Sequence, residues 1–92
     1  EAARLSAQVV ETRRALSKLE EESNAIARDQ SRIRENMARL DQSSQLYAQY
    51  IRKLTDQEAR LESISSERKT LQAQLVTRET ALREYIRDLD VE

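Results

Sequence analysis

Apolar side chains recur along the first forty residues at alternating spacings of four and three. The series starts at Leu5 and ends at Leu40, and eight of its eleven positions are apolar. This is the a/d pattern of a heptad repeat, in which one helix packs an apolar seam against another. The apolar positions of this first seam are Leu5, Val9, Leu16, Leu19, Ile26, Ile33, Met37 and Leu40. The pattern predicts an unbroken amphipathic helix over residues 2–41.

A second seam follows, with spacings that alternate three and four from Tyr47 to Leu89. Ten of its thirteen positions are apolar or tyrosine. These ten are Tyr47, Tyr50, Leu54, Leu61, Ile64, Leu71, Leu75, Leu82, Tyr85 and Leu89. The pattern predicts a second helix over residues 45–90.

The two seams are out of phase with each other. Leu40 occupies a d position and Tyr47 an a position, so the step between them is seven residues where four would continue the repeat. The break coincides with the polar stretch 41–45, whose Asp and Ser side chains can cap a new helix. We therefore predict an all-α fold, an antiparallel two-helix coiled-coil hairpin with its turn at residues 42–44. A continuous helix that absorbs the break as a stammer and forms a dimeric rod is the alternative.

A single fold point at residues 43–44 aligns the two seams. Paired residue numbers then add up to 87, so that Leu40 meets Tyr47 and Gln30 meets Gln57. Two facing amides can each donate a hydrogen bond to the other, and such a layer would fix the register of the two helices. In the other interpretation both amides lean out to solvent. Asp29 and Arg60 fall on one flank of the same layer, close enough to attract.

Polar residues interrupt the seams mainly in the half away from the turn. We expect small side chains there to leave gaps, and we expect arginines at seam positions to extend toward water. The residues concerned are Thr12, Ser23, Arg68 and Arg78.

Three apolar side chains, Leu46, Ile51 and Ile86, lie beside the seam at e or g positions. They widen the apolar stripe, which is compatible with dimerisation of the hairpin into a four-helix assembly. They could equally shield the two-helix seam.

The composition narrows the function classes. The chain has 92 residues, 36% of them charged, with a net charge of −1 and no Gly, Pro, Cys or His. Without glycine no phosphate-binding loop forms, and without His and Cys the commonest metal ligands and nucleophiles are missing. We expect no catalytic, cofactor-binding or metal-binding residues, and no enzyme activity. No apolar run is long enough to enter a membrane.

The expected role is structural: protein–protein interaction, oligomerisation or spacing. The expected partner is a second copy or the rest of a parent protein, because the chain begins at Glu1 rather than Met, as a piece of a longer protein would. Basic residues gather near the turn, but interleaved acidic residues blunt their attraction for phosphate. A nucleic-acid-binding tip is therefore the alternative from another class.

Two stretches carry a resemblance to a known family. They are residues 30–40, which read QSRIRENMARL, and residues 46–62, which read LYAQYIRKLTDQEARLE. They are similar to the C-terminal coiled-coil region of the bacterial mucoidy-inhibitor-like family, whose members carry a largely β domain of unknown function. The resemblance implies an appendage on a larger, often exported, bacterial protein with no established activity; the localisation of this chain stays unknown. Family members often have proline in the turn, where this chain has residues 41–45.

Overall fold

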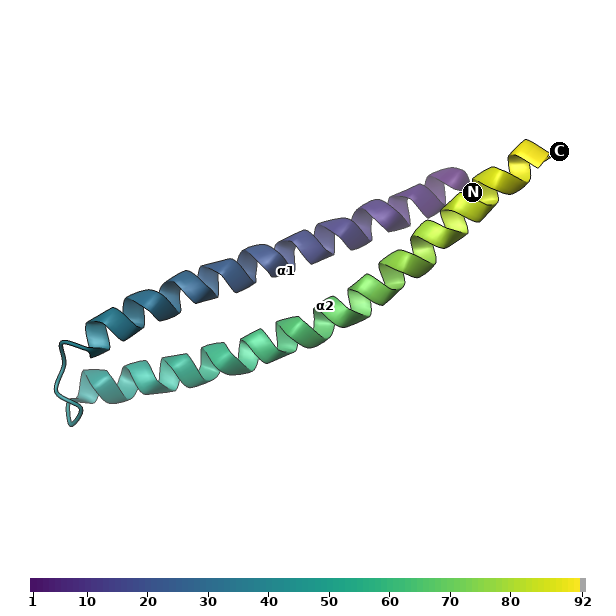
Figure 1. Ribbon diagram of the computed structural model, residues 1–92. Helices are drawn as coiled ribbons and strands as arrows, with labels where there is room; N and C mark the ends of the chain where they lie inside the picture. Colours follow the sequence, from purple (N-terminus) through teal and green to yellow (C-terminus); the bar gives the residue numbers. More distant parts are fainter. Residues whose placement is uncertain (92) are drawn as a thin grey trace. The chain divides into compact units, whose positions relative to one another are not determined.

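A computed structural model describes residues 1–91, with only the backbone for Val91. It contains two helices, α1 (Ala2–Met37) and α2 (Gln45–Val91), joined by a turn (Figure 1). No strand occurs in the described residues. The all-α helical hairpin predicted from the seams is confirmed, and the continuous helix of the dimeric rod is wrong. The single hairpin was predicted over residues 1–92, of which residue 92 lies outside the described part.

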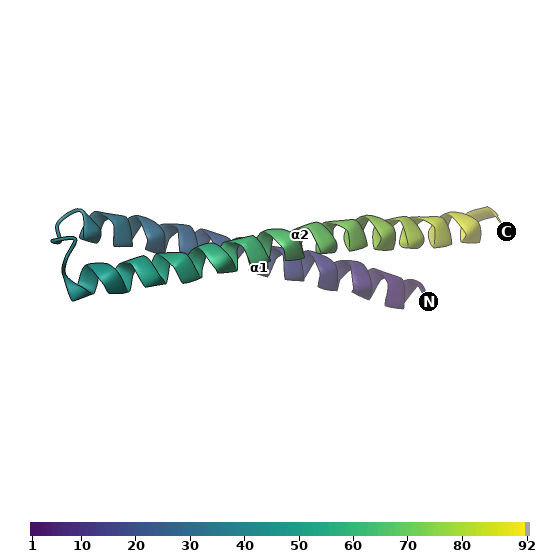
Figure 2. The same cartoon turned by 90° about the horizontal axis from the view of Figure 1, so that it is seen from below.

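The helical pair divides into two compact units, and the boundary falls within both helices. Unit 1 comprises residues 1–19 and the described residues from 66 onward, whereas unit 2 comprises Glu20–Ser65 with the turn. Within each unit a segment of α1 runs alongside a segment of α2 in the opposite direction, as two views at right angles show (Figures 1 and 2). Each unit is therefore a short antiparallel helix pair.

The first helix ends earlier than the seam predicts. It stops at Met37 rather than at residue 41, so the connection covers residues 38–44 rather than 42–44. The amides of Arg39 and Leu40 donate to carbonyls three residues back, at 3.1 Å in each case. This tightening of the last turn is a common way to satisfy the free carbonyls of a helix end. Leu40, in the turn, is still half-buried, so the seam continues past the end of the helix.

Hydrogen bonds of serine and aspartate shape the turn in place of glycine or proline. The Asp41 Oδ1 accepts from the amide and the hydroxyl of Ser43, at 3.0 and 2.9 Å. The amide of Ser44 donates to the Asp41 carbonyl at 3.0 Å, which closes a β-turn. The Ser44 Oγ then accepts from the amide of Tyr47 at 3.1 Å, as an N-cap residue does at the start of a helix. Asp41 thus shapes the turn and Ser44 caps α2.

In unit 2 the seam residues form a narrow core. Ile33 and Ile64 are 0% and 2% exposed and are the best-buried apolar side chains of the unit. The other apolar seam residues of the unit are half-buried, namely Ile26, Met37, Leu40, Tyr47, Tyr50, Leu54 and Leu61. Half-burial is what a two-helix pair allows, because solvent reaches each seam from both flanks.

In unit 1 the core contains apolar and polar side chains together. Val9 and Leu19 are buried, and Thr12 between them is 1% exposed. The remaining apolar seam residues, Leu5, Leu16, Leu71, Leu75, Leu82 and Tyr85, are half-buried. Leu89, predicted for the seam, is 53% exposed. In the register that adds up to 87, Leu89 would face a position before residue 1, so no α1 residue lies opposite it.

Candidate functional site

A polar layer crosses the seam of unit 2 at the two glutamines. The prediction that Gln30 and Gln57 pair with each other is wrong. The Gln30 Nε2 donates to Glu58 Oε1 at 3.0 Å, and the Gln57 Nε2 donates to Asp29 Oδ2 at 2.6 Å. The alternative of two solvated amides is also wrong, since Gln30 is 5% exposed and Gln57 is half-buried. A carboxylate is a stronger acceptor than an amide, so each glutamine turns toward an acidic residue of the opposite helix.

Asp29 is the centre of this layer. Besides the Gln57 amide, its carboxylate accepts from Arg32 at 2.8 and 3.0 Å and pairs with Lys53 Nζ at 3.2 Å. Hydrogen bonding to Arg32, followed by the contacts with Lys53 and Gln57, lowers the pKa of Asp29. The same carboxylate raises the pKa of Arg32. Asp29 therefore stays ionised and ties a glutamine and a lysine of α2 to α1.

Glu22 and Arg60 form the second link on this flank. The Arg60 Nε and Nη2 donate to the two carboxylate oxygens of Glu22 at 2.6 and 2.8 Å. This fork geometry gives direction as well as attraction. The hydrogen bond to Arg60 lowers the pKa of Glu22. The sequence placed Arg60 near Asp29, and the structure brings it to the carboxylate of Glu22, two helical turns earlier.

Asn36 and Tyr50 make a contact that the seam pattern did not indicate. The Asn36 Nδ2 donates to the Tyr50 hydroxyl at 3.1 Å. The residue numbers of this pair add up to 86, as do those of Asp29 and Gln57, and both sums lie close to the predicted 87. A tyrosine at a seam position, with an asparagine directly before its predicted partner Met37, was the available signal.

The seam of unit 1 holds a polar pair, of which Thr12 is buried and Arg78 half-buried. The Arg78 Nη1 donates to Thr12 Oγ1 at 2.5 Å, and that hydroxyl donates to the Gln8 carbonyl at 2.7 Å. Thr12 therefore fills its position rather than leaving a gap. Arg78 is half-buried and turns across the seam, whereas Arg68 is exposed as predicted for a seam arginine.

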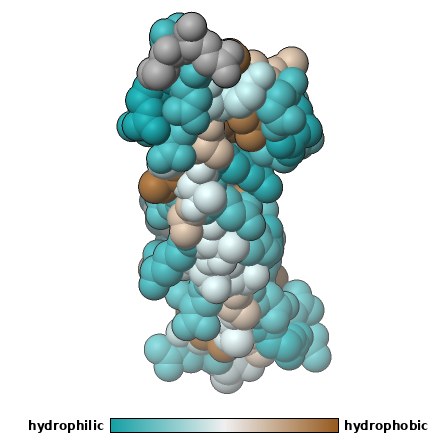
Figure 3. Space-filling view, turned by 90° about the vertical axis from the view of Figure 1, so that its right-hand side faces the viewer, coloured by the Kyte–Doolittle hydropathy of each residue, from teal (hydrophilic) through white to brown (hydrophobic). Residues whose placement is uncertain are grey.

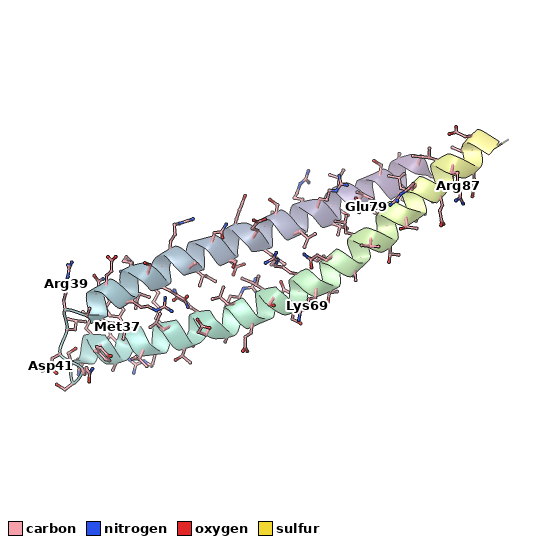
Figure 4. The ribbon with its side chains drawn as sticks, viewed as in Figure 1. Met37, Arg39, Asp41, Lys69, Glu79 and Arg87 are labelled. Carbon is pink, nitrogen blue, oxygen red and sulfur yellow. The ribbon has the colours of Figure 1, made fainter. Side chains whose placement is uncertain are left out.

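One flank of unit 1 exposes apolar side chains beside a shallow groove. Val10, Val76 and Ile86 are 49%, 64% and 48% exposed. By the heptad pattern they lie at b or e positions, on the same flank as the ion pair between Arg13 and Glu79. Figure 4 shows Glu79 on the side of α2 that faces α1. The groove runs between the helices and is lined by Ser6, Val9, Val10, Arg13, Glu79, Leu82, Arg83 and Ile86. We call these three residues with the groove the apolar flank.

The remaining surface in view is mainly polar. On the face drawn in Figure 3, hydrophilic residues predominate and hydrophobic ones form small separate patches. Among the described residues no three acidic side chains converge on a point where a metal ion could bind. Neither helix, within residues 1–91, has a stretch apolar enough to cross a membrane.

Comparisons with known proteins add no relative. No family model, no curated protein and no solved structure matches this chain.

Proposed function

We propose that this chain is a non-catalytic coiled-coil element that mediates contact between proteins, with the apolar flank of unit 1 as its contact surface. The observation that carries the proposal is the distribution of apolar side chains. Among the described side chains, four of the six large apolar residues that are exposed lie in unit 1. The seam beside them is interrupted by Thr12, Arg68 and Arg78. Polar groups inside and apolar groups outside are typical of a helix pair that is covered by a further helix.

The partner that fits this flank is an amphipathic helix of another protein chain. A groove between two helices receives the apolar face of a third helix, as in helix-in-groove recognition. Arg83 and the ion pair of Arg13 with Glu79 border the groove and supply the polar rim of such a contact. The resemblance to the helical tail of the mucoidy-inhibitor-like family supports a chain that, as the appendage of a larger parent protein, contacts another protein.

Site-specific photocross-linking in the native cells tests the proposal. A photoreactive residue replaces Val10 in one variant and Ile86 in a second. In a third variant, the matched control, it replaces the exposed Lys18. We expect positions 10 and 86 to give one product, joined to a helix of one partner sequence. We also expect Val10→Glu/Ile86→Glu to abolish the complex while leaving the helical content unchanged. Equal cross-linking from position 18, or a complex that survives both glutamates, would contradict the proposal.

A further inference from the structure

The charges of unit 2 are segregated along the helix pair. In the register that adds up to 87, residues 31–56 lie on the turn side of the glutamine layer, and we call them the turn end. They contain five Lys or Arg and three Asp or Glu, a net charge of +2. Residues 20–30 and 57–65, which we call the acidic band, contain two Arg and six Asp or Glu, a net charge of −4. Two charged regions of opposite sign thus adjoin within one unit.

Pairing within the chain does not remove this segregation. Asp29 of the band is bonded to Arg32 and Lys53 of the turn end, and Glu22 is bonded to Arg60. These pairs lie on the g flank of both helices. On the opposite flank Arg34 of the turn end and Glu20 and Glu62 of the band are all exposed. That flank therefore presents charges of both signs to solvent.

An exposed apolar residue lies on the same flank. Ile51 occupies an e position in the turn end, as Arg34 does, and is 45% exposed. This flank carries an apolar side chain and a positive group next to a negative region. A second copy in the opposite direction therefore presents negative charge to the positive group and positive charge to the negative region. A two-fold axis brings the turn end of each copy to the band of the other, and satisfies both contacts with one partner.

We propose that two copies of this chain dock through this flank of unit 2 in opposite directions. The turn end of each copy lies against the acidic band of the other, and the two Ile51 side chains are covered. A nucleic acid would also be attracted by the turn end, but the adjoining band would repel its phosphates. Docking through unit 2 is independent of the apolar flank of unit 1, so either proposal can fail alone.

Sedimentation equilibrium of the full chain tests the docking. We expect a dimer whose dissociation constant rises at least about tenfold between about 20 mM and about 500 mM NaCl, because screening weakens contacts between exposed charges. A wild-type chain that stays monomeric at low salt would overturn the proposal. So would a monomer that binds a single-stranded oligonucleotide, which would assign the turn end to nucleic acid.

Charge reversal gives a sharper test. Arg34→Glu/Arg52→Glu makes the turn end acidic, and Glu20→Lys/Glu62→Lys makes the band less acidic. We expect each variant alone to dimerise at least about tenfold more weakly than wild type. A one-to-one mixture should form a heterodimer, because each altered region then meets its opposite in the other variant. The matched control, Lys18→Glu/Glu84→Lys in unit 1, should leave the dissociation constant unchanged.

Circular dichroism of every variant checks that helical content is preserved, as expected for exposed positions. The chain that carries all four reversals restores complementarity and should dimerise like wild type. A mixture that remains monomeric while both variants are folded would overturn the proposal. Undiminished dimerisation of either variant alone would overturn it as well. If a variant does not fold, the salt dependence of the wild-type dimer decides.

Discussion

The guanidinium of Arg60 donates hydrogen bonds to both carboxylate oxygens of Glu22, at 2.6 and 2.8 Å, from the opposite helix of unit 2. Together with Asp29, which ties Gln57 and Lys53 to α1, this pair lines one flank of the seam with ionic links. On the other flank of unit 2 the charged side chains are exposed. Unit 2 therefore has one flank that is closed by its own ion pairs and one that faces solvent.

The narrow core predicts an unequal cost of truncation. Ile33→Ala removes a side chain that is 0% exposed and should lower the free energy of unfolding by about 2–5 kcal/mol. Val76→Ala, the matched control at a position 64% exposed, should change it by less than about 0.5 kcal/mol. Urea denaturation followed by circular dichroism measures both. Equal effects would mean that the seam does not support the fold.

The polar pair in the seam of unit 1 predicts a non-additive pair of substitutions. Thr12→Val keeps the volume but leaves the Arg78 guanidinium without its acceptor, so it should destabilise by about 1–3 kcal/mol. Thr12→Val/Arg78→Leu removes both polar partners and should be as stable as wild type or more stable. Thermal melting of the three chains checks this. A double variant less stable than Thr12→Val would refute the pairing.

An unpartnered acceptor predicts a stabilising change. The Oε1 of Gln57 is buried and accepts no hydrogen bond within the described part of the chain. Gln57→Leu removes that atom, and Asp29 keeps Arg32 and Lys53, so the melting temperature should rise. The comparison is Gln30→Leu, which breaks a hydrogen bond to Glu58. This variant should raise the melting temperature less than Gln57→Leu does. A fall in melting temperature for Gln57→Leu would show that its oxygen is satisfied in solution.

The start of α2 predicts the effect of removing a cap. Ser44→Ala deletes the acceptor for the Tyr47 amide and should cost about 1 kcal/mol, whereas Ser44→Asp should retain most of the stability. The free energy of unfolding of the two variants gives the comparison. If alanine and aspartate behave alike, the hydroxyl does not cap the helix.

The lowered pKa of Asp29 predicts acid sensitivity. The ordinary pKa of an aspartate is about 3.9. Because the folded-state pKa lies below it, the ionised carboxylate stabilises the fold fully above about pH 4, and this stabilisation is lost as the pH falls through the lowered value. Melting temperatures measured downward from pH 6 should fall less for Asp29→Asn than for wild type. Glu21→Gln should show the wild-type slope, since Glu21 forms no ion pair among the described residues.

Much of the fold follows from the heptad spacing, because the period alone decides which side chains meet. The phase break located the turn, and the bond of Asn36 with Tyr50, although not predicted, lies one residue away from the predicted register sum. The end of α1 could not be predicted from residue type, since Ala38 and Arg39 are good helix formers that the closing turn takes out of the helix. The hydrogen-bond partners of the glutamines could not be predicted from the sequence either. Gln30 could reach an amide or a carboxylate, and the rotamer that reaches Glu58 is set by three-dimensional packing.

The polar seam positions of unit 1 show the same limit. A threonine and an arginine at seam spacing indicated gaps and outward extension. The two side chains instead lie within 2.5 Å of each other, because Arg78 is long enough to reach Thr12 across the seam.

Disulfide formation in Leu5→Cys/Leu82→Cys tests the hairpin most directly, because these positions face each other only if the chain folds back on itself. At low protein concentration under mild oxidation, the hairpin predicts rapid and exclusively intrachain disulfide, seen as a monomer of increased mobility on a non-reducing gel. Only interchain products would contradict it.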